Sequence, residues 1–435
     1  MGKNSQFKPA TDIDDVPDAV LNYPLSPGDS RYTDCSKMRG CDTLKKIERM
    51  LKRKKKGYLH LLFTGYRGTG KTTELYQLQD RFQKDYEVFY YDATRELDLT
   101  NCKLTDILMA IAKGIHEHMK TAGCPLPEKI LQDVADWFFE KVLEKEKSIA
   151  AEVGGKTEIS SPKWFSFITA KIFSSVKLDT QKREIMRRKL ESNLPGLIEK
   201  INALLEVAEI QLKARGKKGL IFMMDSLDRL LKGLDRELFI ASGSIFKMLN
   251  ANFVFVVPIS LLFDERTTLL DFERVILPMI PVFEKGKEHI LHEKNIEELK
   301  KLIGKRIVVD CIFTHPEKTL KKLIKASGGH LRDLLKLIYD SCNETDDRIQ
   351  PNHAEIAMNQ LMENYARVIQ DDQYQHLVNI YRYQTTHNDA ISQKLIYNNV
   401  ILVYQQEDNK EWKDVHPVVV RNEKFQKALK RFKGS

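Results

Sequence analysis

The sequence predicts an α/β fold: a parallel five-stranded sheet with a large helical insertion, followed by a helical lid and a C-terminal winged-helix domain. Five near-continuous apolar runs alternate with helical stretches. A glycine-rich loop follows the first of these runs and opens a helical stretch. Near the C-terminus, helical segments give way to two strand-like runs joined by the polar turn QQEDNKE, which is typical of a hairpin wing.

The five apolar runs are the candidate strands. They lack the alternation of a half-buried strand, as expected for strands covered on both faces. They fall at residues 58–64, 87–92, 219–225, 252–260 and 275–283. The helical patterns between them predict crossover connections, and crossovers of this kind join parallel strands.

Composition and periodicity divide the chain into regions. Four prolines and little apolar periodicity at the N-terminus predict a flexible arm. The long helical stretch between the second and third strands predicts a subdomain packed on the edge of the sheet, with a loop at Gly154 and Gly155. The expected regions are the arm (1–30), the α/β core (31–284, with the insertion at 103–215), the lid (285–350) and the winged-helix domain (351–435).

The bulk composition limits the functional classes. The chain has 435 residues and a net charge of +9, which favours nucleotides, nucleic acid or an acidic surface as partners. The longest candidate for a membrane span, residues 253–263, is too short and contains Pro258. None of the six cysteines forms a CxxC pair, so all are expected to be free thiols in a reducing compartment. We therefore expect a cytoplasmic protein without a membrane partner.

The strongest signal is the stretch GYRGTGKT at residues 65–72, which matches the pattern GxxxxGK[ST]. In such a loop, backbone N–H groups and a helix N-terminus together bind phosphates. Lys71 is expected to reach the β- and γ-phosphates, and the Thr72 hydroxyl to bind Mg²⁺. The predicted nucleotide-binding residues are Gly65, Tyr66, Arg67, Gly68, Thr69, Gly70, Lys71, Thr72 and Thr73.

Two acids follow the third strand in the stretch MMDSLDR. Asp225 ends the strand, where an acid beside a phosphate loop binds Mg²⁺, so we assign Asp225 and Thr72 to the metal. Asp228 is the candidate to polarise the attacking water. The alternative is that Asp228 caps a helix beginning near Leu230. Arg229 could pair with either acid.

The phosphate loop, the string IFMMDSLDR and the C-terminal VHPVV together resemble STAND-type P-loop NTPases, relatives of the AAA+ class. The DSLDR ending is similar to KAP-type P-loop ATPases, because Arg229 stands where NACHT-type members commonly have another acid. The resemblance implies ATP as the nucleotide and an ATPase activity that uses Lys71, Asp225 and Asp228.

The resemblance also implies roles for residues outside the phosphate loop. Ser260 would contact the attacking water or the γ-phosphate, and Arg332 in SGGHLRDLL would reach a phosphate from the lid. His416 would hold ADP from the winged helix, although proline replaces the usual acid after it. Each has a simpler alternative, respectively a strand-end loop residue, an ordinary helix residue and a packed histidine. Arg266 and Arg274 are candidates for an arginine finger or for surface salt bridges.

Three functions fit these features. The first is an ATPase that hydrolyses ATP to drive or reset a conformational or assembly switch, with a protein partner or self-assembly; the resemblance implies roles in prokaryotic defence or signalling. The second is a DNA-associated ATPase of the origin-binding or transposition-regulator type that contacts nucleic acid through the winged helix. Its expected recognition helix, near residues 388–399, has just one lysine, which is poor for phosphate contact. The third is an ATP-binding protein that does not hydrolyse its nucleotide.

Overall fold

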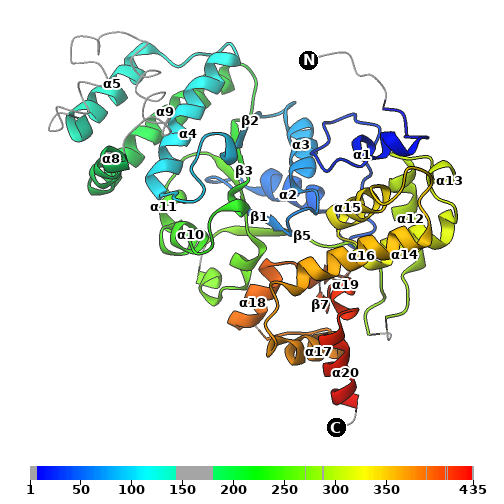
Figure 1. Cartoon of the computed structure of the whole chain (residues 1–435). Helices are drawn as coiled ribbons and strands as arrows, with labels where there is room; N and C mark the ends of the chain where they lie inside the picture. The colour runs from blue at the N-terminus through cyan, green and yellow to red at the C-terminus, as the bar shows by residue number, and fades with distance from the viewer. Residues whose placement is uncertain are drawn as a thin grey trace.

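The computed structural model describes residues 7–143, 180–269, 271–286, 289–387, 389–406, 408 and 410–433. Its centre is a five-stranded, entirely parallel sheet in the order β2-β3-β4-β1-β5 (Figure 1). The strands are β1 (His60–Gly65), β2 (Glu87–Asp92), β3 (Leu220–Asp225), β4 (Asn252–Val257) and β5 (Glu273–Leu277). All five predicted strands are confirmed. β5 ends well before residue 283 because Pro278 and Pro281 cannot donate to a strand ladder.

Helices cover both faces of the sheet, which explains the near-continuous apolar runs. On one face, α2 (Thr43–Arg53) and α3 (Lys71–Phe82) pack against residues such as Phe63 and Val254. On the other face, α4 (Leu104–Thr121) and α9 (Leu194–Ala214) pack against aromatic residues such as Phe222. The shorter elements of the core are η1 (Ile13–Asp15), η2 (Ala93–Arg95), η5 (Leu227–Arg229), α10 (Leu234–Arg236), η6 (Glu237–Ala241), α11 (Gly243–Phe246), η7 (Ile259–Phe263) and η8 (Glu265–Leu269).

The insertion at 103–215 is helical wherever it is described. Besides α4 and α9 it contains α5 (Glu128–Phe138), η3 (Phe139–Leu143) and α8 (Thr180–Ser192). The expectation that it packs on the edge of the sheet is wrong for α4 and α9, which form the layer over one face. Gly114 permits this close packing, because a Cβ atom there would lie 2.7 Å from the Phe89 ring. The loop predicted at Gly154 and Gly155 lies outside the described residues.

The expected flexible arm is wrong for residues 7–20, which pack against the lid, and for residues 22–25, which contact the nucleotide-binding core. The Ala10 N–H donates to the Arg306 carbonyl (2.9 Å), and the Ala10 carbonyl accepts from the Val308 N–H (2.8 Å). Val16 and Val20 are buried in the apolar core of the lid. The prolines do not indicate flexibility here, since Pro17 occupies the first turn of α1 (Val16–Ala19), a favourable helix position.

The lid is a helical bundle that lies beside the nucleotide-binding core (Figure 1). Its helices are α12 (Glu293–Gly304), α13 (Val309–Ile312), α14 (Pro316–Ser327), α15 (Leu331–Cys342) and α16 (Pro351–Ala366). We expected residue 351 to begin the next domain, but α16 packs on α14 and α15 and buries Ala354, Ala357 and Met358 in the lid core. The boundary therefore lies between Ala366 and Gln373, and apolar periodicity alone could not show which core α16 joins.

The C-terminal domain has its own apolar core, with Leu377, Leu395 and Val403 among its buried residues. Its elements are α17 (Gln373–Tyr383), α18 (Ala390–Tyr397), β6 (Ile401–Gln405), β7 (Glu411–Val415), α19 (Pro417–Val420) and α20 (Glu423–Lys433). β6 and β7 form the predicted antiparallel hairpin. The order of two helices and a hairpin is the one expected of a winged-helix domain. Among the described helices, none combines the length and apolar character needed to cross a bilayer.

Candidate nucleotide-binding site

The phosphate loop joins β1 to α3, and α3 begins at Lys71. Gly68 and Gly70 have φ angles of 97° and 95°, a region that favours glycine. A Cβ atom at Gly68 would also lie 2.4 Å from the Arg332 Cβ atom, so this glycine allows the lid to approach the loop. A Cβ atom at Gly65 would lie 2.7 Å from the Leu277 carbonyl oxygen of β5.

The carbonyl oxygens of the loop face the protein, and donors from three regions hold them. Phosphate binding uses the N–H groups of such a loop, so its carbonyl oxygens need partners elsewhere in the chain. The pairs are Lys71 Nζ with the Gly65 (3.0 Å) and Tyr66 (2.8 Å) carbonyls, Thr69 Oγ1 with the Tyr66 carbonyl (2.9 Å), Arg39 Nη2 with the Thr69 carbonyl (2.7 Å), and the Arg332 N–H with the Gly68 carbonyl (3.2 Å).

Asp225 and Thr72, the two predicted metal ligands, are in direct contact. Asp225 Oδ2 accepts hydrogen bonds from Thr72 Oγ1 and from the Tyr90 hydroxyl, both at 2.7 Å. Burial raises the pKa of Asp225, and the charge of Asp228 adds to this, although hydrogen bonds from Thr72, Tyr90 and Ser226 partly offset it. A buried carboxylate beside a hydroxyl is the oxygen donor set that Mg²⁺ prefers, and a bound cation would favour the charged form of Asp225.

Asp228 pairs with the lysine of the phosphate loop. Its Oδ2 atom lies 2.8 Å from Lys71 Nζ, and the two side chains are 9% and 6% exposed. The helix-cap alternative is wrong, because α10 begins at Leu234 with Gly233 as its N-cap residue. Asp228 lies within the short turn η5, which follows Ser226 in the left-handed region (φ 69°). Ser226 thus turns the chain so that the acid three residues after Asp225 reaches the pocket.

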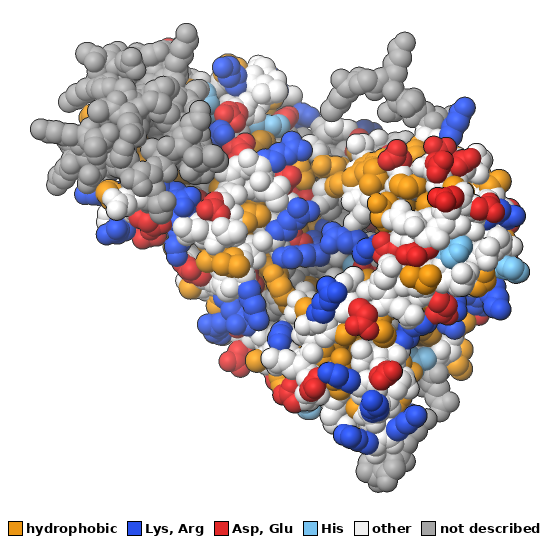
Figure 2. Space-filling view, viewed as in Figure 1, with side chains coloured by type: hydrophobic (Ala, Val, Ile, Leu, Met, Phe, Trp, Pro, Cys, Tyr) orange, Lys and Arg blue, Asp and Glu red, His pale blue; other side chains and the backbone are white. Residues whose placement is uncertain are grey.

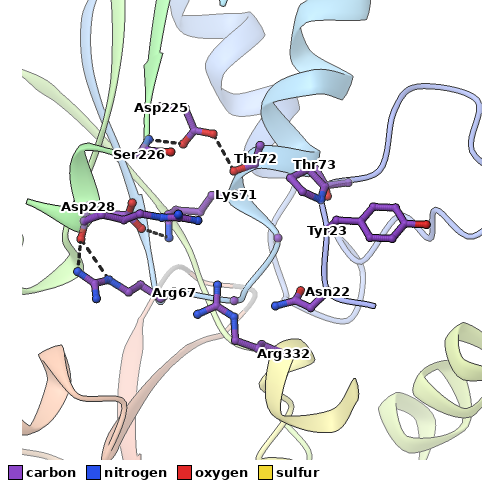
Figure 3. A pocket seen from close by; sticks show the side chains of 14 residues that line it. Asn22, Tyr23, Arg67, Lys71, Thr72, Thr73, Asp225, Ser226, Asp228 and Arg332 are labelled. Atoms are coloured by element: carbon purple, nitrogen blue, oxygen red, sulfur yellow. Dashed lines mark hydrogen bonds and ion pairs between the residues drawn. The ribbon is translucent and has the colours of Figure 1, made fainter. Parts of the chain in front are cut away.

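A pocket opens in front of these side chains (Figure 3). Four of its lining residues are basic and two are acidic, a balance that suits a polyphosphate anion. Lys and Arg side chains gather near the centre of the face shown in Figure 2. The pocket is lined by Asn22, Tyr23, Pro24, Arg67, Gly68, Gly70, Lys71, Thr72, Thr73, Asp225, Ser226, Asp228, Arg229 and Arg332.

Arg332 lies where the sequence predicted it, at the phosphate loop. It is in the first turn of α15 and lines the pocket opposite the Asp225–Thr72 pair (Figure 3). Burial lowers its pKa from the ordinary value, the neighbouring cations Arg229 and Arg67 lower it further, and Asp333 and Asp228 oppose this shift. An arginine so close to other cations gains electrostatically when an anion enters the pocket.

Several predicted residues do not line the pocket. The Tyr66 side chain points away and its hydroxyl donates to the Ile401 carbonyl of the C-terminal domain (2.7 Å). Ser260 lies in η7, because Pro258 ends β4 and turns the chain away. His416 is fully buried and contacts Asp333 (3.0 Å) rather than the pocket, which corresponds to the packed-histidine alternative. Gly65 and Thr69 shape the loop from behind, through the contacts described above.

The two arginine-finger candidates have intramolecular partners. Arg266 forms a two-point contact with Asp264, at 2.9 and 2.8 Å, and its side chain is 55% exposed. Arg274 lies in β5, and its Nη1 atom donates to the Thr267 carbonyl (3.4 Å). The salt-bridge alternative therefore describes Arg266.

Sequence reasoning missed the contribution of the N-terminal segment and of β2. Asn22, Tyr23 and Pro24 line the pocket, and the Leu25 N–H donates to Thr73 Oγ1 of α3 (3.1 Å). No pattern marked these residues, because their segment is irregular and its anchors are single contacts. Tyr90 was visible as part of a strand, but its contact with Asp225 depends on the register that places Asp92 beside Asp225.

Comparison with known proteins found similarity among solved structures. No protein-family model matches the chain, and no curated protein does. Among solved structures, it is similar to Cdc6p from Pyrobaculum aerophilum (13% identity, TM-score 0.39, covering 96% of this chain and 98% of that one). It is also similar to Orc1 from Aeropyrum pernix in complex with DNA (13%, 0.32, 97% and 96%) and to RuvB from Thermotoga maritima (14%, 0.35, 89% and 93%).

Proposed function

We propose that this chain is an AAA+-related P-loop ATPase of the STAND or KAP kind, which hydrolyses ATP to switch the position of its C-terminal domain. The observation that carries the proposal is the convergence of Lys71, Thr72, Asp225 and Arg332 on one basic pocket at the phosphate loop. These are the residue types that phosphoryl transfer requires: a loop cation, a metal pair and a further arginine.

Each residue has a defined task in this proposal. Thr72 and Asp225 would hold Mg²⁺, which when bound neutralises the charge on the phosphate oxygens. Lys71 and Arg332 bind and orient the β- and γ-phosphates from opposite sides of the pocket. Asp228 orients the attacking water and accepts its proton.

The switch part of the proposal rests on contacts between the phosphate loop and the C-terminal domain. Besides the bond from Tyr66 to Ile401, Arg67 Nη2 donates to the Tyr397 hydroxyl of α18 (3.1 Å), and the guanidinium lies over the Tyr397 ring. Two consecutive residues of the loop therefore bind the C-terminal domain directly. Any movement of the loop on nucleotide binding changes these contacts.

The same packing disfavours DNA binding through α18, the expected recognition helix. Gln393 of α18 donates to the Phe263 carbonyl of η7 (2.9 Å) and accepts from Arg236 Nη2 (2.6 Å). In this arrangement the nucleotide-binding core occupies the surface of α18 that carries Gln393 and Tyr397. A role on DNA would first require this interface to open.

The proposal is tested by measuring phosphate release with ATP and Mg²⁺, with and without duplex DNA. We expect turnover by the native chain, no turnover by Lys71→Ala, and no stimulation by DNA. The matched control is Lys84→Ala, an exposed lysine just past α3. The ATPase proposal fails if the native chain binds ATP without hydrolysing it. Stimulation by DNA would favour the DNA-associated alternative.

A further inference from the structure

A buried group of polar side chains links the phosphate loop to the C-terminal domain. Its centre is Asp333 of α15, whose Oδ2 atom lies 2.9 Å from His330 Nδ1, 3.0 Å from His416 Nε2 and 2.6 Å from the Tyr365 hydroxyl. His330 and His416 are 0% exposed, and Asp333 is 5% exposed. His330, Asp333 and Tyr365 belong to the lid, and His416 is the residue that precedes α19 of the C-terminal domain. We call these four residues the Asp333 cluster.

The protonation state of His330 follows from its two contacts. His330 Nε2 lies 2.6 Å from the Arg67 carbonyl oxygen, which can only accept, so Nε2 carries a proton. Nδ1 faces Asp333 Oδ2 in a contact that is short but not aligned as a hydrogen bond. A bare Nδ1 lone pair would be repelled by a carboxylate at this distance, so Nδ1 also carries a proton. His330 is therefore an imidazolium if Asp333 is ionised.

Asp333 accepts hydrogen bonds from the Tyr365 hydroxyl and from His416 Nε2, and both contacts favour its ionised form. Burial acts to raise its pKa, but the charge of His330 and the hydrogen bond from His416 hold it well below the usual range. The charged groups that face the pair are few: Arg332 is adjacent in α15, and His416 and Tyr365 donate hydrogen bonds without a net charge. An imidazolium and a carboxylate in contact leave the buried cluster neutral overall, which limits the cost of burial.

His416 is a neutral donor rather than a metal ligand. Its Nδ1 atom accepts from the Val418 N–H (3.4 Å), which leaves the proton on Nε2, facing Asp333. Burial lowers the pKa of His416, in agreement with the neutral form. His330, Asp333 and His416 are close enough together to hold a cation. With protons on the two nitrogens that face Asp333, neither nitrogen has a lone pair to offer a metal ion.

We propose that His330, held as an imidazolium by Asp333, is a positioning residue for the phosphate loop and couples that loop to the docking of the C-terminal domain. In a trans peptide, the carbonyl of Arg67 and the N–H of Gly68 point in opposite directions. By holding the Arg67 carbonyl, His330 turns the Gly68 N–H toward the pocket that Gly68 lines. His416 contacts the same Asp333 carboxylate that keeps His330 charged. Undocking of the C-terminal domain would remove His416 from Asp333 and so change the contact between His330 and the Arg67 carbonyl.

The inference deepens the proposed nucleotide binding, and calorimetric titration of the full chain with ATP and Mg²⁺ tests it. The amide of His330→Asn is too short to reach the Arg67 carbonyl, while His330→Gln keeps a neutral amide donor near the position of Nε2. We expect the ATP dissociation constant to rise about tenfold for His330→Asn, the loss typical of a charge-assisted hydrogen bond, and less for His330→Gln. The control is His60→Gln, a buried histidine that contacts the Leu249 carbonyl (3.1 Å) far from the loop. Native-like ATP affinity in folded His330→Asn overturns the inference.

A second measurement keeps the inference testable if these variants do not fold. Nitrogen-15 NMR of histidine-labelled native chain, with the His330 signal assigned through His330→Gln, reports whether both ring nitrogens are protonated at neutral pH. A neutral His330 ring, or a stoichiometric metal ion retained after purification, overturns the proposal. The coupling is tested by combining His330→Gln with His416→Gln, whose effects on ATP affinity we expect to be non-additive. If the native chain binds no ATP, the proposed function fails, while the NMR result still decides the charge of His330.

Discussion

Lys71 Nζ lies 2.8 Å from Asp228 Oδ2, and both side chains are buried at the mouth of the phosphate loop. The charge of the loop lysine is thus paired with an acid of the same chain. Phosphate groups must compete with Asp228 for this lysine, so the acid proposed to act on water also weakens ATP binding. Asp228 should therefore affect both ATP binding and hydrolysis, which an acid with only a structural role would not do.

We predict that Asp228→Asn binds ATP more tightly than the native chain but hydrolyses it more slowly. Binding improves because a negative charge next to the phosphates is removed. Turnover falls on the order of 100-fold because the proton acceptor is lost. Calorimetry and phosphate release measure the two effects, with Asp235→Asn, a buried acid of the same segment, as control. Normal turnover by Asp228→Asn would show that this acid has no role in the reaction.

Because Asp225 is buried, we expect the free energy of unfolding to depend on pH. Burial raises its folded-state pKa above the ordinary 3.8, so the folded chain binds this proton more tightly than the unfolded chain. The free energy of unfolding therefore falls as the pH rises through this range. We expect Asp225→Asn, without nucleotide, to be more stable than the native chain at neutral pH. Urea denaturation should show this gap closing toward about pH 4.

When Mg²⁺ and ATP are present, we expect the native chain to be more stable than Asp225→Asn. Only the native chain retains the charged acid that the metal requires, so ligand binding stabilises it and not Asp225→Asn. If ATP and Mg²⁺ raise the denaturation midpoint of both proteins equally, the assignment of Asp225 to the metal is wrong.

Arg332 is predicted to favour triphosphate over diphosphate. The resemblance assigns it to the β- or γ-phosphate, and a γ-phosphate contact would make Arg332→Ala lose about tenfold in affinity for ATP and less for ADP. Arg229→Ala is the matched control, since Arg229 lines the same pocket but is exposed. Calorimetric titrations with both nucleotides decide the matter, and equal losses for ATP and ADP would place Arg332 away from the γ-phosphate.

Tyr397→Phe should loosen the docking of the C-terminal domain. The change removes the hydroxyl that accepts from Arg67 Nη2 but keeps the aromatic ring. We expect faster amide hydrogen exchange in α18, with the fold of the core unchanged. Tyr383→Phe is the control, because the Tyr383 side chain is 66% exposed. Identical exchange in the two variants would mean that the bond to Arg67 contributes nothing to docking.

The N-terminal segment is predicted to stabilise the lid. Val16 is 0% exposed in the lid core, so Val16→Ala should lower the free energy of unfolding by about 1–2 kcal/mol. Leu21→Ala should change it little, because Leu21 is 49% exposed. Denaturant titration compares the two variants, and equal values would mean that the segment is not part of the folded core.

The parts of the site that depend on local chain order were predictable. The loop at residues 65–72 and the acid Asp225 each follow a buried strand, and parallel strands bring such ends to one edge of the sheet. Asp228 was also predicted, because the short turn η5 directly follows β3. The loop and the two acids lie at this edge because each directly follows a strand. Arg332 was expected by resemblance alone, and it reaches the loop because the lid packs against Gly68.

The parts that depend on packing between distant segments were not predictable. Proline content suggested a flexible arm, yet single apolar anchors such as Val16 hold residues 7–20 on the lid. His416 was assigned to the nucleotide by resemblance, whereas its buried position directs it to Asp333. The periodicity of α16 was correctly read as helical, but a helix can bury the same apolar stripe in either neighbouring domain.

The central claim is that nucleotide at the phosphate loop controls the docking of the C-terminal domain. Amide hydrogen exchange in β6 and α18, measured with and without a non-hydrolysable ATP analogue and Mg²⁺, tests it most directly. We predict that the analogue accelerates exchange in these two elements of the native chain and has no effect in Lys71→Ala. Unchanged exchange in a native chain shown to be saturated with the analogue would mean that nucleotide does not control the docking of the C-terminal domain.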